Sequence, residues 1–143
     1  MAKPHPTDKR FEWRVSLSLA ELELSKLVPE EARMCFIGMK VIAKDYLAVI
    51  CPKLKSYHLK MIFFNCMQTR DPALWCEENV EEAFRCLLSK VIDCVQTRNC
   101  PNFWFPQINM FDGFNDENCK KLSKKLIEIS KQPKEFIELD FQN

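Results

Sequence analysis

The sequence has little glycine and little histidine, and each shortage excludes a class of site. With only two glycines in 143 residues, the sequence cannot form the repeated-glycine loops that hold phosphates in P-loop and dinucleotide-binding proteins. Two histidines, His5 and His58, provide few members for a histidine-based catalytic pair. The 8 cysteines never form a Cys-x-x-Cys pair, which is the usual zinc knuckle. We therefore predict no catalytic centre and no metal site in this chain.

Long hydrophobic runs and an excess of one charge are also missing. No run reaches the roughly 18 apolar residues that span a bilayer, and the N-terminus lacks the apolar core of a signal peptide. We expect no membrane insertion, reduced cysteines, and a location in the cytosol or nucleus. Because 21 Lys and Arg balance 20 Asp and Glu, nucleic-acid binding would need a local basic surface.

The residues that are present indicate one helical domain. The sequence is 47% hydrophobic and 29% charged, and its apolar residues recur mainly at helical spacing. We expect a disordered lead over residues 1–10 and an all-α domain over residues 11–143, built as an irregular bundle of about five helices. Residues 11–17 are expected to be extended. The expected helices run from about residue 19 and then over 29–50, 56–67, 77–97 and 116–130.

Two local patterns complete the predicted fold. Ser18 and Glu21 have the spacing of a capping box, in which each side chain accepts a hydrogen bond from a backbone N–H of the first helical turn. The segment 101–111 is too aromatic for a solvated linker and too proline-interrupted for a helix. We expect this segment to lie across the bundle.

The motif Ser56-Tyr57-His58-Leu59-Lys60 opens a helix with a hydroxyl group, an aromatic ring and a lysine. A serine hydroxyl and helix-start N–H groups suit phosphate oxygens, and a tyrosine ring can stack on a base, with Lys40, Lys55 or Lys60 adding positive charge. The alternative is structural: Ser56 caps the helix and Tyr57 packs with its hydroxyl hydrogen-bonded. For His58 we expect a structural hydrogen bond.

The last predicted helix carries many lysines. Those on or near its polar side could contact phosphates, but glutamates lie among them, and such mixed charge is usually a solvated helix face. Nucleic-acid binding through this helix is therefore the weaker hypothesis. The lysines concerned are Lys120, Lys121, Lys124, Lys125 and Lys131.

Three segments, taken in order, resemble the Mab-21 family, which includes cyclic GMP-AMP synthase. They are Trp13-Arg14-Val15-Ser16-Leu17-Ser18 with Glu21, then Ser56-Tyr57-His58-Leu59-Lys60, then Cys94-Val95-Gln96-Thr97 through Phe105-Pro106-Gln107-Ile108-Asn109. The resemblance implies the C-terminal helical, HhH/H2TH-like lobe of a two-lobed nucleotidyltransferase-like fold. The mixed α/β lobe of that fold, which carries a Gly-Ser motif and metal-binding carboxylates, has no counterpart in this sequence.

The resemblance also implies roles for individual residues. Tyr57 would stack on a nucleotide base, Ser56 would approach its phosphates, and Lys40 would be a further phosphate contact. Magnesium and ATP or GTP would bind only with a catalytic lobe, supplied upstream or by another chain, so this chain alone would need no cofactor and would be inert. The synthase grips DNA through a zinc insertion, whereas residues 25–40 hold one cysteine and no histidine, so DNA binding by that route is not expected.

A different class of function stays open. The aromatic strip Phe103 to Phe105, or an exposed face of the first helix, could bind a protein partner. The chain would then be a stand-alone interaction module, or the product of a truncated gene, without nucleotide-related activity.

Overall fold

The computed structural model describes residues 19–69 and 79–133. The predicted lead over residues 1–10, the extended segment 11–17 and the helix cap at Ser18 lie outside these ranges.

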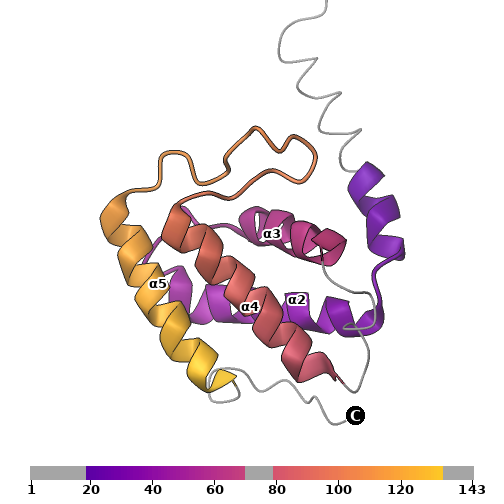
Figure 1. The fold of residues 1–143 in the computed structure, drawn as a ribbon, viewed down its shortest axis with the longest axis horizontal. Helices are drawn as coiled ribbons and strands as arrows, with labels where there is room; N and C mark the ends of the chain where they lie inside the picture. Colours follow the sequence, from indigo (N-terminus) through magenta and orange to yellow (C-terminus); the bar gives the residue numbers. More distant parts are fainter. Residues whose placement is uncertain (1–18, 70–78, 134–143) are drawn as a thin grey trace, which may run out of the picture.

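The described residues form helices packed together, as the predicted all-α class requires (Figure 1). A helical segment at residues 19–26 comes first. Within the two described ranges no β-sheet is present, and one isolated antiparallel bridge joins Pro101 to Asn109. The labelled elements are α2 (Glu30–Ile42), the π-helical turn η1 (Ala43–Leu47), α3 (Ser56–Thr69), α4 (Val80–Thr97) and α5 (Asp116–Lys131).

The second predicted helix is shorter than its apolar period suggested. α2 ends at Ile42 and continues as η1, where the Ala48 N–H donates to the Ala43 carbonyl five residues back at 2.8 Å. A π-helical turn is wider than the 3.6-residue α-helical repeat, so the periodicity of the sequence did not predict it. The inward residues nevertheless follow the prediction. Those that are buried are Ala32, Cys35, Met39, Ile42 and Leu47.

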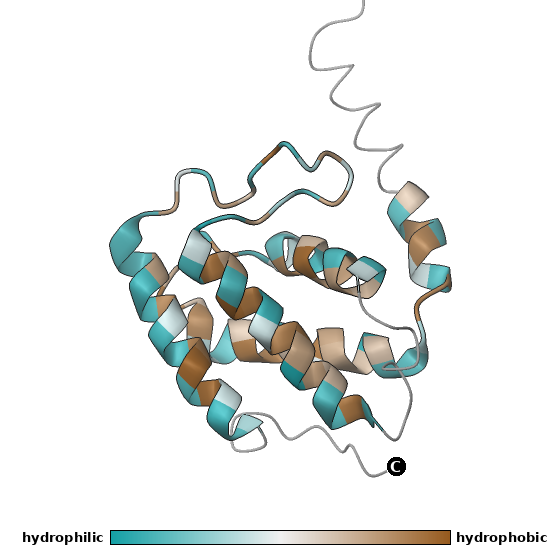
Figure 2. Ribbon diagram, in the orientation of Figure 1, coloured by the Kyte–Doolittle hydropathy of each residue, from teal (hydrophilic) through white to brown (hydrophobic). Residues whose placement is uncertain are grey.

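α4 is the central helix, because it contacts α2, α3 and α5. Its predicted apolar stripe is buried, and its end at Thr97 agrees with the prediction, whereas residues 77–78 of the predicted start lie outside the described ranges. Figure 2 shows apolar and hydrophilic colours alternating along α4, whereas hydrophilic colours dominate α5, the peripheral helix. Ile92 of the predicted stripe is only half-buried and packs against the core, and Cys94, which was not predicted, is buried. The buried residues of the predicted stripe are Val80, Ala83, Phe84, Leu87, Leu88, Val91 and Val95.

The connection between α4 and α5 lies across α3, as predicted for the aromatic segment. The Asn65 side chain on α3 donates to the Pro101 carbonyl at 3.0 Å, and the Phe103 ring packs edge-on against Phe64 with centroids 5.4 Å apart. Asn102 stabilises one turn of this connection, since its side-chain oxygen accepts from the backbone N–H groups of the two residues that follow Phe103 at 2.8 and 3.0 Å. These bonds replace the regular backbone pairing that proline interrupts.

The cysteines in the described ranges are free thiols, and most of them are buried. Burial raises the pKa of Cys35 to about 12, so this thiol stays protonated and behaves as a small apolar side chain. The buried cysteines are therefore part of the hydrophobic core.

Candidate functional site

α3 begins at Ser56, and the side chain of Ser56 is exposed. The first turn is closed by His58, whose Nδ1 accepts a hydrogen bond from the Lys55 N–H at 2.9 Å. This bond occupies the place that the Glu side chain takes in a capping box. Hence the predicted structural hydrogen bond of His58 is confirmed, and Ser56 is exposed in the first turn of the helix.

The His58 ring lies between α3 and the connection to α5. It packs edge-on against Phe114, with centroids 5.3 Å apart, and at a tilt against Phe111 at 5.7 Å. Burial lowers the pKa of His58 below its usual value of 6.5, so the ring is neutral at pH 7 and Nδ1 is free to accept. A neutral ring held by these contacts is a structural element.

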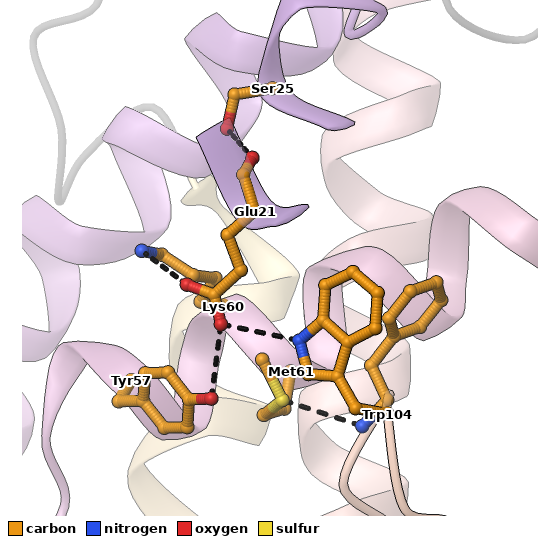
Figure 3. Close-up of polar contacts among 7 residues, drawn as sticks. Glu21, Ser25, Tyr57, Lys60, Met61 and Trp104 are labelled. Atoms are coloured by element: carbon orange, nitrogen blue, oxygen red, sulfur yellow. Dashed lines mark hydrogen bonds and ion pairs between the residues drawn. The ribbon is translucent and has the colours of Figure 1, made fainter. Parts of the chain in front are cut away.

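Tyr57, which lies between Ser56 and His58 on α3, is half-buried and reaches the helical segment 19–26. Its hydroxyl donates to the Glu21 carboxylate at 3.0 Å (Figure 3). The same carboxylate accepts from the Lys60 ammonium at 3.4 Å and from the Trp104 indole N–H at 3.2 Å. We call Glu21, Tyr57, Lys60 and Trp104 the Glu21 cluster.

The Glu21 cluster joins three segments that are distant in sequence. Glu21 comes from residues 19–26, Tyr57 and Lys60 lie one turn apart on α3, and Trp104 comes from the connection that crosses α3. The Glu21 side chain is 12% exposed, and such a carboxylate is stable only when its oxygens are hydrogen-bonded or paired with a cation. The cluster provides both, and it therefore fixes how the N-terminal helical segment docks on the bundle.

The cluster changes the chemistry of Tyr57. Partial burial, the nearby Glu21 carboxylate and the hydrogen bond to it together raise the pKa of Tyr57 to about 12. The hydroxyl therefore stays a donor at every physiological pH, and Tyr57 is unsuited to act as a general base. The positive charge of Lys60 is paired with Glu21, which weakens the prediction that Lys60 supplies free charge to a phosphate.

Lys40 lies on α2, and its side chain is exposed. The ammonium group sits 5.3 Å from the centroid of the Phe36 ring, in a cation–π arrangement one turn apart on the same helix. In the described part of the chain, no hydrogen bond or ion pair joins Lys40 to Ser56 or Tyr57. The structure thus brings Ser56 and Tyr57 together at the start of α3 and leaves Lys40 as a separate predicted contact.

Two members of the cluster were missed by the sequence analysis. Glu21 was assigned to a capping box with Ser18, which lies outside the described residues, and its hydrogen bonds to side chains from other segments were not predicted. A signal was present, because Glu21 shares one helical face with Leu24 and Val28, which pack against the core. A glutamate on an apolar face indicates a buried partner, although no sequence pattern names Trp104, which lies 83 positions away.

The residues described provide no evident metal site. No group of three or more His, Cys, Asp or Glu side chains in residues 19–69 and 79–133 is placed to hold a metal ion. Nor is any described helix both long enough and apolar enough to cross a membrane. At the start of α3, the exposed Ser56 and the first N–H groups of the helix can bind an anion. The Tyr57 ring beside them can stack on another ring.

Comparison with known proteins bears directly on this arrangement. Residues 31–128 match the Mab-21 protein HhH/H2TH-like domain. The chain is 23% identical over 117 residues to "Protein mab-21-like" of Drosophila pseudoobscura pseudoobscura, and the match covers 81% of this chain and 32% of that protein. The same identity and coverage hold for "Protein mab-21-like" of Drosophila melanogaster. The chain therefore spans about a third of the length of these curated relatives.

Proposed function

The chain belongs to the Mab-21 family through its HhH/H2TH-like domain, and on that premise we propose that it is the helical lobe that contacts a nucleotide held by a nucleotidyltransferase-like lobe. The observation that carries the proposal is the start of α3. There an exposed serine hydroxyl stands next to a half-exposed tyrosine ring whose hydroxyl is already fixed. Ser56 would contact phosphate oxygens and Tyr57 would stack on the base.

The Glu21 cluster supports this role by holding Tyr57 in place. A ring that is anchored through its hydroxyl loses little conformational freedom when a base stacks on it, and this lowers the entropic cost of binding. The first N–H groups of a 14-residue helix carry partial positive charge and favour an anion beside Ser56. Lys40 is proposed as a further, longer-range phosphate contact.

A nucleotide titration tests the site residues. We would follow the backbone amide NMR signals of the chain while adding ATP, and separately GTP, with magnesium. The lobe alone should bind with a dissociation constant on the order of 1 mM, and the largest shifts should fall on residues 55–60. Ser56→Ala should weaken binding about tenfold or more, because a hydrogen bond to a charged group contributes roughly 1.5–3 kcal/mol.

Ser89→Ala is the matched control, because Ser89 is also an exposed helical serine and lies on α4. It should leave the titration unchanged. Equal weakening by both alanine variants, or shifts centred away from the start of α3, would contradict the assignment of Ser56 and Tyr57.

The proposal also places the catalytic step outside this chain. The purified chain should show no nucleotide transfer with magnesium, and transfer by it alone would overturn the proposal. The intact mass of the endogenous protein, captured with an antibody to this domain, identifies where the other lobe resides. A mass well above 16.9 kDa indicates one longer polypeptide, whereas a mass of 16.9 kDa indicates a separate chain as the partner lobe.

A specific observation favours a second candidate, the protein-interaction module. The helical segment 19–26 exposes two leucines, Leu19 at 59% and Leu22 at 55%, and Leu27 follows at 78%. Leu24, Val28 and α3 border a shallow cavity of about 260 Å³ beside them. Three exposed leucines in one segment are typical of a binding surface.

The two candidates respond to different variants. Replacing Leu22 and Leu27 with Ser should abolish capture of a partner and leave the ATP titration intact if this surface binds protein. If the nucleotide site is correct, Ser56→Ala should weaken nucleotide binding, and the leucine variants should leave it unchanged.

A further inference from the structure

A second hollow lies on another part of the molecule, between α4 and α5. The two helices run antiparallel, since Arg98 after α4 pairs with Asp116 at the start of α5, and Arg85 near the other end of α4 donates to the Ser130 carbonyl (Figure 1). Between them lies a groove with a volume of about 620 Å³. We call it the α4–α5 groove.

The α4–α5 groove has an apolar floor. Val95 from α4 and Cys119 from α5 line it and are buried, and Ile127 of α5 lines it while remaining 38% exposed. Covering the exposed part of Ile127 with a partner is favourable by about 25 cal/mol per Å² of apolar surface removed from water. The floor therefore favours a ligand with an apolar side.

The rim of the α4–α5 groove on α5 is cationic. Lys120, Lys124 and Lys131 line the groove, and no ion pair engages any of them in the described part of the chain. The groove's other cation, Arg98, is already paired with Asp116 at 2.7 Å. Two carboxylates also line the groove, but Asp116 is paired with Arg98 and Glu128 is paired with Lys125 at 3.6 Å. The three lysines therefore have no ion-pair partner among the described residues.

The spacing of these lysines indicates an elongated partner. They share one face of α5 with Ile127, and Lys120 lies about 16 Å from Lys131 along the axis, at a rise of about 1.5 Å per residue. A compact anion would reach one or two of them, whereas a helix lying along the groove could place acidic side chains against all three. A helix can also insert an apolar stripe between two antiparallel helices.

We propose that the α4–α5 groove docks an acidic amphipathic helix of another protein, with its apolar stripe on Ile127 and its carboxylates on Lys120, Lys124 and Lys131. Charge complementarity selects the acidic side, and the apolar floor selects an amphipathic segment over a nucleic-acid backbone, which has no apolar stripe to cover Ile127. This surface is separate from the start of α3 and from the exposed leucines of residues 19–27.

The test uses a fluorescein-labelled synthetic helix of about 18 residues, long enough to keep helical structure. One face carries Leu and Ile, and glutamates flank it at i, i+4 spacing. Fluorescence anisotropy against the full chain should show saturable binding that weakens with salt, because exposed charges are screened over about 10 Å at 0.1 M ionic strength. A second peptide with every Glu replaced by Lys should not bind.

Charge variants with equal net charge locate the binding surface. Lys120→Gln with Lys124→Gln should weaken binding about tenfold, which corresponds to two exposed pairs of roughly 0.7 kcal/mol each. The matched control, Lys44→Gln with Lys53→Gln, removes two exposed lysines elsewhere and should leave affinity unchanged. Ile127→Thr should weaken binding about fivefold, through the loss of about 1 kcal/mol of apolar burial.

Three outcomes would overturn the proposal. The first is the absence of saturable peptide binding, and the second is an equal loss of peptide affinity in the groove variant and in its control. The third is displacement of the peptide by a single-stranded oligonucleotide whose own affinity does not change with Ile127→Thr. The last outcome would assign the lysines to a nucleic-acid backbone. Circular dichroism of each variant confirms that the helices are intact.

Discussion

The Glu21 cluster and the α4–α5 groove use the same residue type in opposite ways. In the cluster, Lys60 pairs at 3.4 Å with a carboxylate that is 12% exposed, and the neighbouring polar groups are hydrogen-bonded to the same carboxylate. In the groove, Lys120 and Lys124 line an open hollow and belong to no ion pair in the described residues. One lysine holds the fold together, whereas the others are available to a partner.

The origin of the difference is where the carboxylates come from. Glu21 reaches Lys60 from 39 positions away, so tertiary packing creates that pair. On α5 the carboxylates are local: Glu117 pairs with Lys121 and Glu128 pairs with Lys125. Because side chains three and four residues apart on a helix meet, these local pairs use up the glutamates and leave the groove lysines without one.

The largest expected effect is at the centre of the cluster. Glu21→Ala removes the acceptor of three donors and leaves the Lys60 charge without its partner, so we expect a loss of about 3 kcal/mol in the free energy of unfolding. Chemical denaturation followed by circular dichroism measures it. Glu23→Ala is the control, because Glu23 is exposed and pairs with Lys26, and it should change stability by less than about 0.5 kcal/mol. Equal effects would erase the contrast between internal and surface charge.

A second polar group used internally is His58. His58→Ala removes the cap on the Lys55 N–H and the packing against two phenylalanine rings, for an expected loss of about 2 kcal/mol.

The pH dependence of that loss follows from the lowered pKa of His58. The fold favours the neutral ring, so the contribution is fully present above pH 6.5 and is lost as the pH falls through the lower folded-state pKa. Unfolding of the wild type and of His58→Ala, measured from pH 8 downward, should therefore converge in acid. Parallel curves would show that the fold does not lower the pKa of His58.

A smaller effect is expected at the hydroxyl of Tyr57. Tyr57→Phe keeps the ring and removes one hydrogen bond to Glu21, which should lower stability by about 1 kcal/mol at pH 7. The pKa of Tyr57 is raised to about 12, so the fold favours the protonated hydroxyl. Its contribution is present below pH 10 and is lost as the pH rises toward 12, and the two proteins should converge there.

The same variant separates structure from ligand contact. If the ring stacks on a base, Tyr57→Phe should lower stability but keep most of the nucleotide affinity, losing only what the anchoring of the ring contributes. Loss of affinity in step with stability would mean that the hydroxyl, and not the ring, meets the nucleotide.

Sequence periodicity predicted the α-helices well because burial of one face is a local property. α4 was predicted to end at Thr97 and α5 to begin at Asp116, and both bounds agree with the structure. The π-helical turn η1 was missed because it inserts an extra residue without changing the apolar character of its neighbours.

The candidate site was only half predictable. The motif at the start of α3 drew attention to Ser56 and Tyr57, but the partner of Tyr57 depends on how the segment 19–26 docks, and that is a tertiary property. Lys60 was offered as free positive charge, and only the structure shows it paired with Glu21. The same ambiguity affects both regions, because the sequence does not show whether a distant carboxylate reaches a given lysine.

The smallest expected effect is the sharpest test of the comparison, because it contrasts two lysines directly. Lys60→Gln removes a cation from a carboxylate that stays mostly buried, so stability should fall by about 0.5–1 kcal/mol. Lys124→Gln removes a cation with no ion pair in the described residues, so stability should change by less than about 0.3 kcal/mol. Adding 1 M salt should shrink the first difference and leave the second near zero, since screening acts on an existing pair. If Lys124→Gln cost as much as Lys60→Gln, the groove lysines would be structural, and the surface proposed for an acidic helix would already be satisfied from within the chain.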